Sequence, residues 1–163
     1  MATISAQEAS GQNVVAFLDM LAWSEGTDNG RQATMNHGYD VLVGGALFTD
    51  LSRHPNKLVR LNPKLASTAA GRYQFLSRTW TALQRMLGLK DFSPLSQDKG
   101  CIELIRGRKA LAAVKDGQFD RAVALCAKEW ASLPGANYGQ HEQSLEKLRL
   151  VYKKAGGTLG RGE

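Results

Sequence analysis

Apolar residues recur at helical spacing along most of this chain, which restricts the fold to a largely helical one. Val14, Leu18 and Leu21 form an i, i+4, i+7 stripe, and Asn13 or Ser10 is the candidate cap at its start. Further stripes predict helices within residues 71–87, 93–105, 122–130 and 141–155.

The region between the first stripe and the later ones has a different pattern. Residues 26–40 are polar and rich in turn-forming residues, and a short apolar run follows at residues 41–48. This run is interrupted by Gly44 and Gly45, which is typical of a small hairpin or two short strands. We expect residues 50–70, which contain two prolines, to form a long basic loop. The sequence therefore predicts an α+β fold that is mostly helical with a small β lobe.

Length and composition indicate one soluble domain. The 163 residues are 43% hydrophobic and 22% charged, which suits a single domain over residues 1–163. We expect its ends, residues 1–12 and 157–163, to be flexible. No apolar run approaches the roughly 20 residues of a membrane span. The first 13 residues contain neither Lys or Arg nor an apolar segment, so we expect no secretory signal and no membrane insertion.

Cysteine and histidine spacing predicts no metal site and no cofactor. Cys101 and Cys126 lie 25 residues apart, and no C-x-x-C or H-E-x-x-H pattern is present. We interpret both thiols as small buried residues of a protein that accumulates in a reducing compartment.

Positive charge is concentrated in one part of the chain. Residues 51–90 carry eight Lys or Arg and no Asp or Glu, whereas residues 1–50 carry one Arg and six carboxylates. Such a window attracts polyanions, among them nucleic acid and the acidic bacterial wall, or it is simply a solvated face. No nucleic-acid motif accompanies it, so we do not expect nucleic acid as a partner. A basic, non-enzymatic binding protein stays as one alternative.

Four residues beyond the first stripe lies Glu25, in the last turn of the predicted helix. Partial burial and the negative end of the helix dipole would both raise the pKa of its carboxyl. A general acid that works near neutral pH needs such a raised pKa. The plain alternative is an exposed glutamate at a frayed helix end. If the enzyme is a two-carboxylate glycosidase, Asp40 or Asp50 would be the second carboxylate.

Two further motifs carry groups that can bind sugars. The segment Ala70–Gln74 places the amide of Gln74 at a predicted helix start. The loop after Trp130 contains Tyr138 and Gln140, an aromatic ring and an amide separated by glycine. Both patterns also occur in ordinary helix starts and surface loops.

From about Ala16 to Thr158 the chain resembles the endolysins of lambda-type bacteriophages. The similar segments, in the same order, are AFLDMLAWSEGTDNGRQ, NHGYDV, LNPKL, GRYQ, LGLKDFSP, WASLPGA, YGQ and KAGGT. The resemblance implies a lysozyme-like α+β fold whose β lobe forms one wall of a glycan-binding cleft. It also implies a peptidoglycan lytic transglycosylase, which breaks the bond between N-acetylmuramic acid and N-acetylglucosamine and forms a 1,6-anhydro product.

The resemblance assigns roles to particular residues. The catalytic glutamate of the W-S-E-G-T motif falls on Glu25, and Tyr73, Gln74, Tyr138 and Gln140 fall on segments implied to bind glycan. The loops at residues 51–66 and 132–141 match two lips that close over the glycan strand.

An anhydro-forming reaction also explains why no convincing second carboxylate follows Glu25. One glutamate can first protonate the leaving oxygen and then take a proton from the muramic C6 hydroxyl. T4-type lysozymes have an Asp nine residues after the glutamate, where this chain has Thr34. A hydrolase that uses Glu25 with Asp40 or Asp50 stays as the second alternative.

The resemblance also predicts where the protein acts. We expect a monomer that stays in the host cytoplasm until a phage holin opens the inner membrane, and that then reaches the periplasm and the cell wall.

Overall fold

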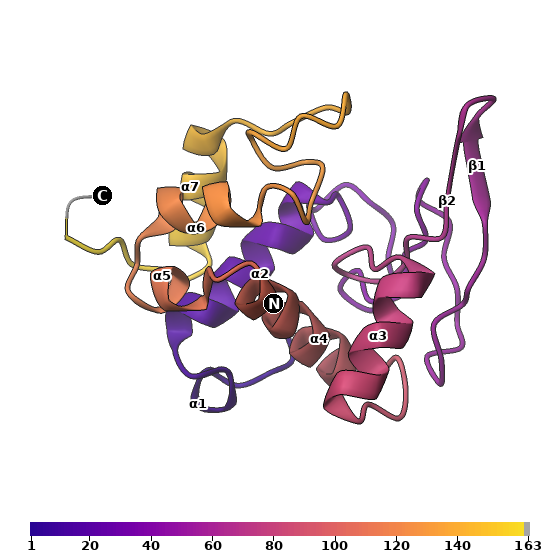
Figure 1. The fold of residues 1–163 in the computed structure, drawn as a ribbon, viewed down its shortest axis with the longest axis horizontal. Coiled ribbons are helices and arrows are strands. Elements are labelled where there is room, and N and C mark those ends of the chain that lie inside the picture. The colour runs from indigo at the N-terminus through magenta and orange to yellow at the C-terminus, as the bar shows by residue number, and fades with distance from the viewer. Residues whose placement is uncertain (162–163) are drawn as a thin grey trace.

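Helix α2 (Gln12–Ser24) runs through the centre of the molecule and is buried on nearly all sides (Figure 1). The computed structural model describes residues 1–161. The other helices packed against α2 are α1 (Ala6–Ala9), α4 (Pro94–Gly107), α5 (Leu111–Lys115) and α7 (Leu145–Lys154). Because other helices surround α2, its C-terminal end is fixed in place, and so is Glu25, the residue that directly follows the helix.

The predicted start of α2 is wrong in detail. Gly11 is its N-cap, and no side chain caps the helix. The amide of Asn13 instead donates to the Lys115 carbonyl at 3.1 Å and accepts the Thr158 N–H at 2.9 Å. Asn13 therefore ties the C-terminal segment to α2.

The expected loop at residues 50–70 contains a hairpin. Strand β1 (Val59–Asn62) pairs antiparallel with β2 (Leu65–Ser67), and the turn lies at Pro63 and Lys64. The hairpin stands away from the helical body in Figure 1. The run at residues 41–48, expected as a small hairpin or two short strands, forms a turn with an isolated antiparallel bridge between Val41 and Leu47.

The helix predicted from residue 71 begins later. Helix α3 spans Ser77–Leu87, and the preceding residues form a tight turn closed by hydrogen bonds between Ala70 and Phe75. Gly71 and Gln74 both have positive φ, +85° and +54°, which a right-handed helix does not allow. Tyr73 follows the helical period in sequence but lies in this turn.

The later helices agree with the sequence apart from their boundaries. Ser93 caps α4 with its side chain, and Pro94 is the first helical residue, close to the predicted start at residue 93. The stripe at residues 122–130 belongs to α6 (Phe119–Cys126), which ends before Trp130. Helix α5 has only five residues, too few to show a period in sequence. Among residues 1–161 the structure has seven helices and one two-stranded sheet, so the α+β prediction is confirmed.

Both described ends of the chain make hydrogen bonds to the rest of the fold, whereas the flexibility expected for residues 1–12 and 157–163 stays a prediction. The Ala2 N–H donates to Asp19 at 2.7 Å, and the Ile4 N–H donates to Asp98 at 2.8 Å. Near the other end, the Gly160 N–H donates to the Gly117 carbonyl at 2.8 Å. Residues 162–163 lie outside the described residues. Within the described part of the chain, no helix is long and apolar enough to cross a bilayer.

Candidate active site

A groove of about 490 Å³ lies between the hairpin and the segment that leads into α7. Figure 1 shows the hairpin and this segment as two projections beyond the helices. Glu25 lines the groove at the end of α2. The other lining residues are Val43, Leu61, Leu65, Ala66, Ser67, Ala69, Gln74, Leu76, Lys128, Glu129, Trp130, Ala131, Tyr138 and Gln140.

The position of Glu25 is set by the end of α2. Its backbone N–H donates to the Leu21 carbonyl at 2.8 Å, and Gly26 then leaves the helix with φ +79°. The hydroxyl of Ser132 donates to Oε2 of Glu25, and the hydroxyl of Ser24 lies 2.7 Å from that of Ser132. The stripe from Val14 to Leu21 thus ends at Glu25, whose carboxyl lines the groove and is held there by Ser132.

Burial raises the pKa of Glu25 from its ordinary 4.5 to about 7, although hydrogen bonds from Ser132 oppose this shift. Near neutral pH a large share of the molecules therefore carries a protonated carboxyl. A group with this pKa can donate a proton and then accept one without a change of pH.

Neither sequence candidate for a second carboxylate lies in the groove. Asp40 is buried and accepts hydrogen bonds from the Thr34 hydroxyl at 2.5 Å and the Met35 N–H at 2.9 Å. Asp50 accepts the Ser52 N–H and hydroxyl in an exposed turn. Both aspartates hold local loop structure, so the geometry does not support a hydrolase that uses either of them.

Another carboxylate, that of Glu129, does line the groove, although the sequence pattern did not predict it. Its Oε1 accepts a hydrogen bond from Nε of Arg108 at 3.2 Å. The pairing gives Glu129 a structural role that Glu25 lacks, because within residues 1–161 the Glu25 carboxyl accepts hydrogen bonds from Ser132 and forms no ion pair.

Three of the four predicted sugar-binding residues, Gln74, Tyr138 and Gln140, line the groove. The fourth, Tyr73, is fully buried, and its hydroxyl donates to Asp98 at 2.6 Å. Because this leaves Tyr73 no surface for a ligand, we do not retain it as a sugar-binding residue. It follows the helical period because it packs in the core.

The amide of Gln74 and the ring of Tyr138 are both fixed in place by hydrogen bonds. The amide nitrogen of Gln74 donates to the carbonyls of Gly71 and Val41 at 2.9 and 3.2 Å, which leaves its carbonyl oxygen for a ligand. The Tyr138 hydroxyl donates to the Lys128 carbonyl at 2.7 Å, and the Tyr138 residue is 53% exposed. An exposed ring held by its hydroxyl can pack against the face of a sugar.

The segment that carries Tyr138 is closed at its base. The Gln143 N–H donates to the Ser132 carbonyl at 2.7 Å, and the Glu142 carboxylate accepts the N–H groups of Gly135 and Asn137, each at 3.0 Å. Ser132 lies in the WASLPGA segment but was not predicted as a site residue, because it is 107 residues from Glu25 and the sequence does not show that the two meet.

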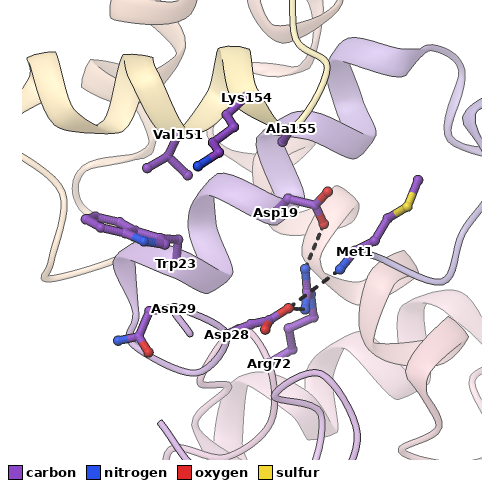
Figure 2. Close-up of a pocket in the computed structure, with 9 residues that line it drawn as sticks. All are labelled: Met1, Asp19, Trp23, Asp28, Asn29, Arg72, Val151, Lys154 and Ala155. Atoms are coloured by element: carbon purple, nitrogen blue, oxygen red, sulfur yellow. Dashed lines mark hydrogen bonds and ion pairs between the residues drawn. The ribbon is translucent and has the colours of Figure 1, made fainter. Parts of the chain in front are cut away.

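A second hollow, of about 540 Å³, lies beside α2 and α7 and does not include Glu25. Figure 2 shows the Trp23 ring on one side and a cluster of Asp19, Asp28 and Arg72 on the other. Arg72 donates to Asp28 at 2.6 Å and to Asp19 at 2.7 Å, so these charges are paired with one another. Within residues 1–161 no group of three or more His, Cys, Asp or Glu side chains is placed to hold a metal ion.

Fold and groove together define a lysozyme-like protein. Two solved structures are similar over 98% of this chain and 99% of theirs. They are the bacteriophage lambda lysozyme complexed with a chitohexasaccharide (57% identity, TM-score 0.90) and the lysozyme from bacteriophage lambda (55% identity, TM-score 0.86). The lysozyme-like fold expected from the sequence is therefore confirmed.

The family is defined by sequence as well. The Endolysin family model matches residues 15–159. The endolysin of Escherichia phage lambda is 62% identical over 144 residues, which cover 88% of this chain and 91% of that protein. The endolysin of Escherichia phage P2 is 51% identical over 159 residues, covering 90% and 94%. The chain belongs to the endolysin family, the phage enzymes that degrade bacterial peptidoglycan.

Proposed function

We propose that this endolysin is a lytic transglycosylase that cleaves the β-1,4 bond between N-acetylmuramic acid and N-acetylglucosamine. The observation that carries the proposal is one carboxyl, Glu25, which is the only unpaired carboxyl among the described residues of the groove and has a pKa of about 7. A hydrolase that retains or inverts configuration needs two carboxyl groups flanking the bond. Asp40 and Asp50 are both absent from the groove lining.

In the proposed reaction, Glu25 acts twice. Its protonated carboxyl gives a proton to the glycosidic oxygen as the bond from that oxygen to C1 of the muramic residue breaks. The C6 hydroxyl of the same residue then attacks C1, and its proton passes to the Glu25 carboxylate. The N-acetyl group of the sugar can stabilise the positive centre meanwhile. No water enters, the 1,6-anhydro ring closes, and Glu25 returns to its starting state.

The groove residues support the binding of a glycan strand. The carbonyl of Gln74 can accept an N-acetyl N–H, and the exposed Tyr138 ring and the Gln140 amide offer a sugar a face and polar contacts. The solved lambda lysozyme complex contains a chitohexasaccharide, which supports the same class of ligand here. We assign the hairpin and the loop at residues 132–141 as the two lips of the site.

The direct test is mass spectrometry of the fragments that the enzyme releases from purified peptidoglycan. Fragments ending in anhydro-muramic acid, one water lighter than hydrolysis products, are expected. Reducing ends that carry the full water would identify a hydrolase and would refute the transglycosylase.

The activity should fall on the alkaline side of neutrality. Only the protonated form of Glu25 can start the reaction, and burial holds its pKa at about 7. We therefore expect kcat/KM to decrease about tenfold for each pH unit well above 7. The measurement is turnover of a soluble glycan-strand fragment from pH 5 to 9 at constant ionic strength. A rate that stays flat up to pH 9 would contradict the role of Glu25 as the acid.

Salt should weaken attachment to intact cell walls. Seven of the eight cations of residues 51–90 are exposed, and Arg53, Lys57, Arg60 and Lys64 lie on or beside the hairpin. Since screening lengths shrink to roughly 6 Å at 0.3 M salt, we expect wall sedimentation assays to show weaker binding at ~0.3 M than at ~0.03 M. Turnover of a short soluble glycan-strand fragment, which carries far fewer charges than the wall, serves as the control and should change less. Salt-independent binding to walls would remove this role from the hairpin cations.

By the family resemblance, we propose that the enzyme acts as a monomer and reaches the wall after a phage holin has opened the inner membrane. Purified enzyme added from outside should then lyse only cells whose outer membrane has been permeabilised. Expression from inside the cell should require a co-expressed holin for lysis.

A further inference from the structure

We propose that Ser24 and Ser132 are positioning residues that hold the carboxyl of Glu25 for proton transfer, through a chain of hydroxyls that ends at its Oε2 oxygen. This inference rests on the proposed function, because it concerns how Glu25 acts as an acid. It begins from two contacts: Ser132 donates to Oε2 of Glu25, and the hydroxyls of Ser24 and Ser132 lie 2.7 Å apart.

The direction of this hydroxyl chain follows from the count of protons. The Ser132 hydroxyl has a single hydrogen, which it donates to Glu25. While Glu25 is ionised, Ser24 is therefore the donor in the contact between the two serines. The chain runs from Ser24 to Ser132 to Oε2 of Glu25. Ser24 is only 4% exposed, so water has little access to reverse the chain from its far end.

This chain holds one oxygen of the carboxyl in place. When Glu25 is ionised, Oε2 accepts the Ser132 hydrogen, and when Glu25 is protonated, its hydroxyl and that of Ser132 can each donate or accept. The contact can therefore persist in both protonation states, so the chain fixes the position of the carboxyl through both halves of the reaction.

Ser132 also links the position of the Glu25 carboxyl to the loop at residues 132–141. Ser132 begins the loop at residues 132–141, and its carbonyl accepts the Gln143 N–H that closes the base of this loop. A movement of the lip base would shift the hydroxyl that holds Glu25. The charged groups that line the groove beside Glu25 are Lys128 and Glu129. Lys128 donates to the Ala136 carbonyl at 2.6 Å, and Glu129 pairs with Arg108.

The test compares Ser132→Ala, Ser132→Thr and Ser24→Ala by steady-state kinetics and by carbon-13 NMR titration of the Glu25 carboxyl. Ser132→Ala should lower kcat by about tenfold, the loss expected for one hydrogen bond to a charged group, with KM unchanged. Because the hydrogen bond from the Ser132 side chain lowers the pKa of Glu25, the carboxyl of this variant should titrate above 7, and the alkaline fall in kcat/KM should move to higher pH. Ser132→Thr keeps the hydroxyl and should restore the wild-type profile.

Ser24→Ala removes the donor behind Ser132 without touching Glu25, and we expect kcat to fall by about threefold. The matched control is Ser5→Ala, which also removes one hydroxyl hydrogen bond, at the N-cap of α1, and should leave kcat unchanged. Unchanged kcat and an unchanged Glu25 titration in both Ser132→Ala and Ser24→Ala would overturn the proposal. If the Ser132→Ala protein does not fold, kcat and the Glu25 titration of Ser24→Ala alone test the proposal, and unchanged values would overturn it.

The two proposals fail separately. Reducing-end products from the wild-type enzyme would refute the transglycosylase, whereas the titration would still show whether the serines hold the Glu25 carboxyl. Anhydro products from Ser132→Ala at the wild-type rate would refute the positioning role and leave the transglycosylase intact.

Discussion

A Glu25→Gln enzyme is expected to degrade peptidoglycan at least about a thousandfold more slowly than the wild type, with its fold intact. General acid–base catalysis contributes factors of roughly 10² to 10⁴, and the amide can neither donate the required proton nor accept one from the C6 hydroxyl. The change is nearly isosteric, and the amide can still accept the Ser132 hydrogen bond. The measurement is the rate of fragment release from purified walls, with circular dichroism to verify folding.

Two other glutamates make this result specific. Glu146 is exposed in the first turn of α7, and Glu146→Gln should retain full activity. Glu129→Gln tests the remaining carboxylate of the groove. We expect a modest loss, because Glu129 is paired with Arg108 at 3.2 Å. An active Glu25→Gln enzyme together with an inactive Glu129→Gln enzyme would transfer the catalytic role to Glu129.

Glu25 could be predicted from the sequence because its environment is local. The stripe on α2 fixes the direction of the helix face, and the carboxyl lies one turn beyond Leu21. Ser132 could not be predicted in this way. It meets Glu25 only because α2 and the loop after Trp130 are brought together by packing, across 107 residues of sequence.

The hairpin was missed for a different physical reason. Three of the four residues of β1 are exposed, and its alternation of apolar and polar residues (VRLN) spans only four positions. The strand therefore has no buried face, and its pattern is too short to stand out in a segment with two prolines. Tyr73 shows the opposite error. Its helical spacing predicted a helix, whereas the positive φ angles of Gly71 and Gln74 require a turn.

Arg72 shows why a count of charges is an incomplete guide to the surface. In sequence it belongs to the cations expected to attract polyanions, yet its side chain is 1% exposed. Its guanidinium donates to Asp28 at 2.6 Å, to Asp19 at 2.7 Å and to the His37 carbonyl at 2.5 Å. These partners come from α2 and from the polar stretch at residues 26–40, and Figure 2 shows two of them, Asp19 and Asp28. Arg72 therefore joins the turn before α3 to the loop that follows Glu25.

Arg72→Met is expected to lower the free energy of unfolding by about 3–5 kcal/mol, the range found when one partner of a buried ion pair is removed. Methionine fills much of the volume but leaves Asp19 and Asp28 without their shared cation. Urea unfolding followed by tryptophan fluorescence measures the change. Arg78→Met, at an exposed position of α3, is the matched control and should change stability by less than about 0.5 kcal/mol.

The pH dependence of the same variant identifies the cause. Partial burial raises the pKa of the Asp28 carboxyl, but the hydrogen bond and charge of Arg72 outweigh this effect and leave the pKa below 3.8. A carboxyl with a lowered pKa stabilises the fold above its unfolded pKa, and this contribution disappears as the pH falls through the folded value. The stability gap between wild type and Arg72→Met should therefore be full at pH 7 and narrow below about pH 4. A gap of the same size at pH 3 and pH 7 would assign the loss to packing around the buried stem of Arg72 rather than to its charge.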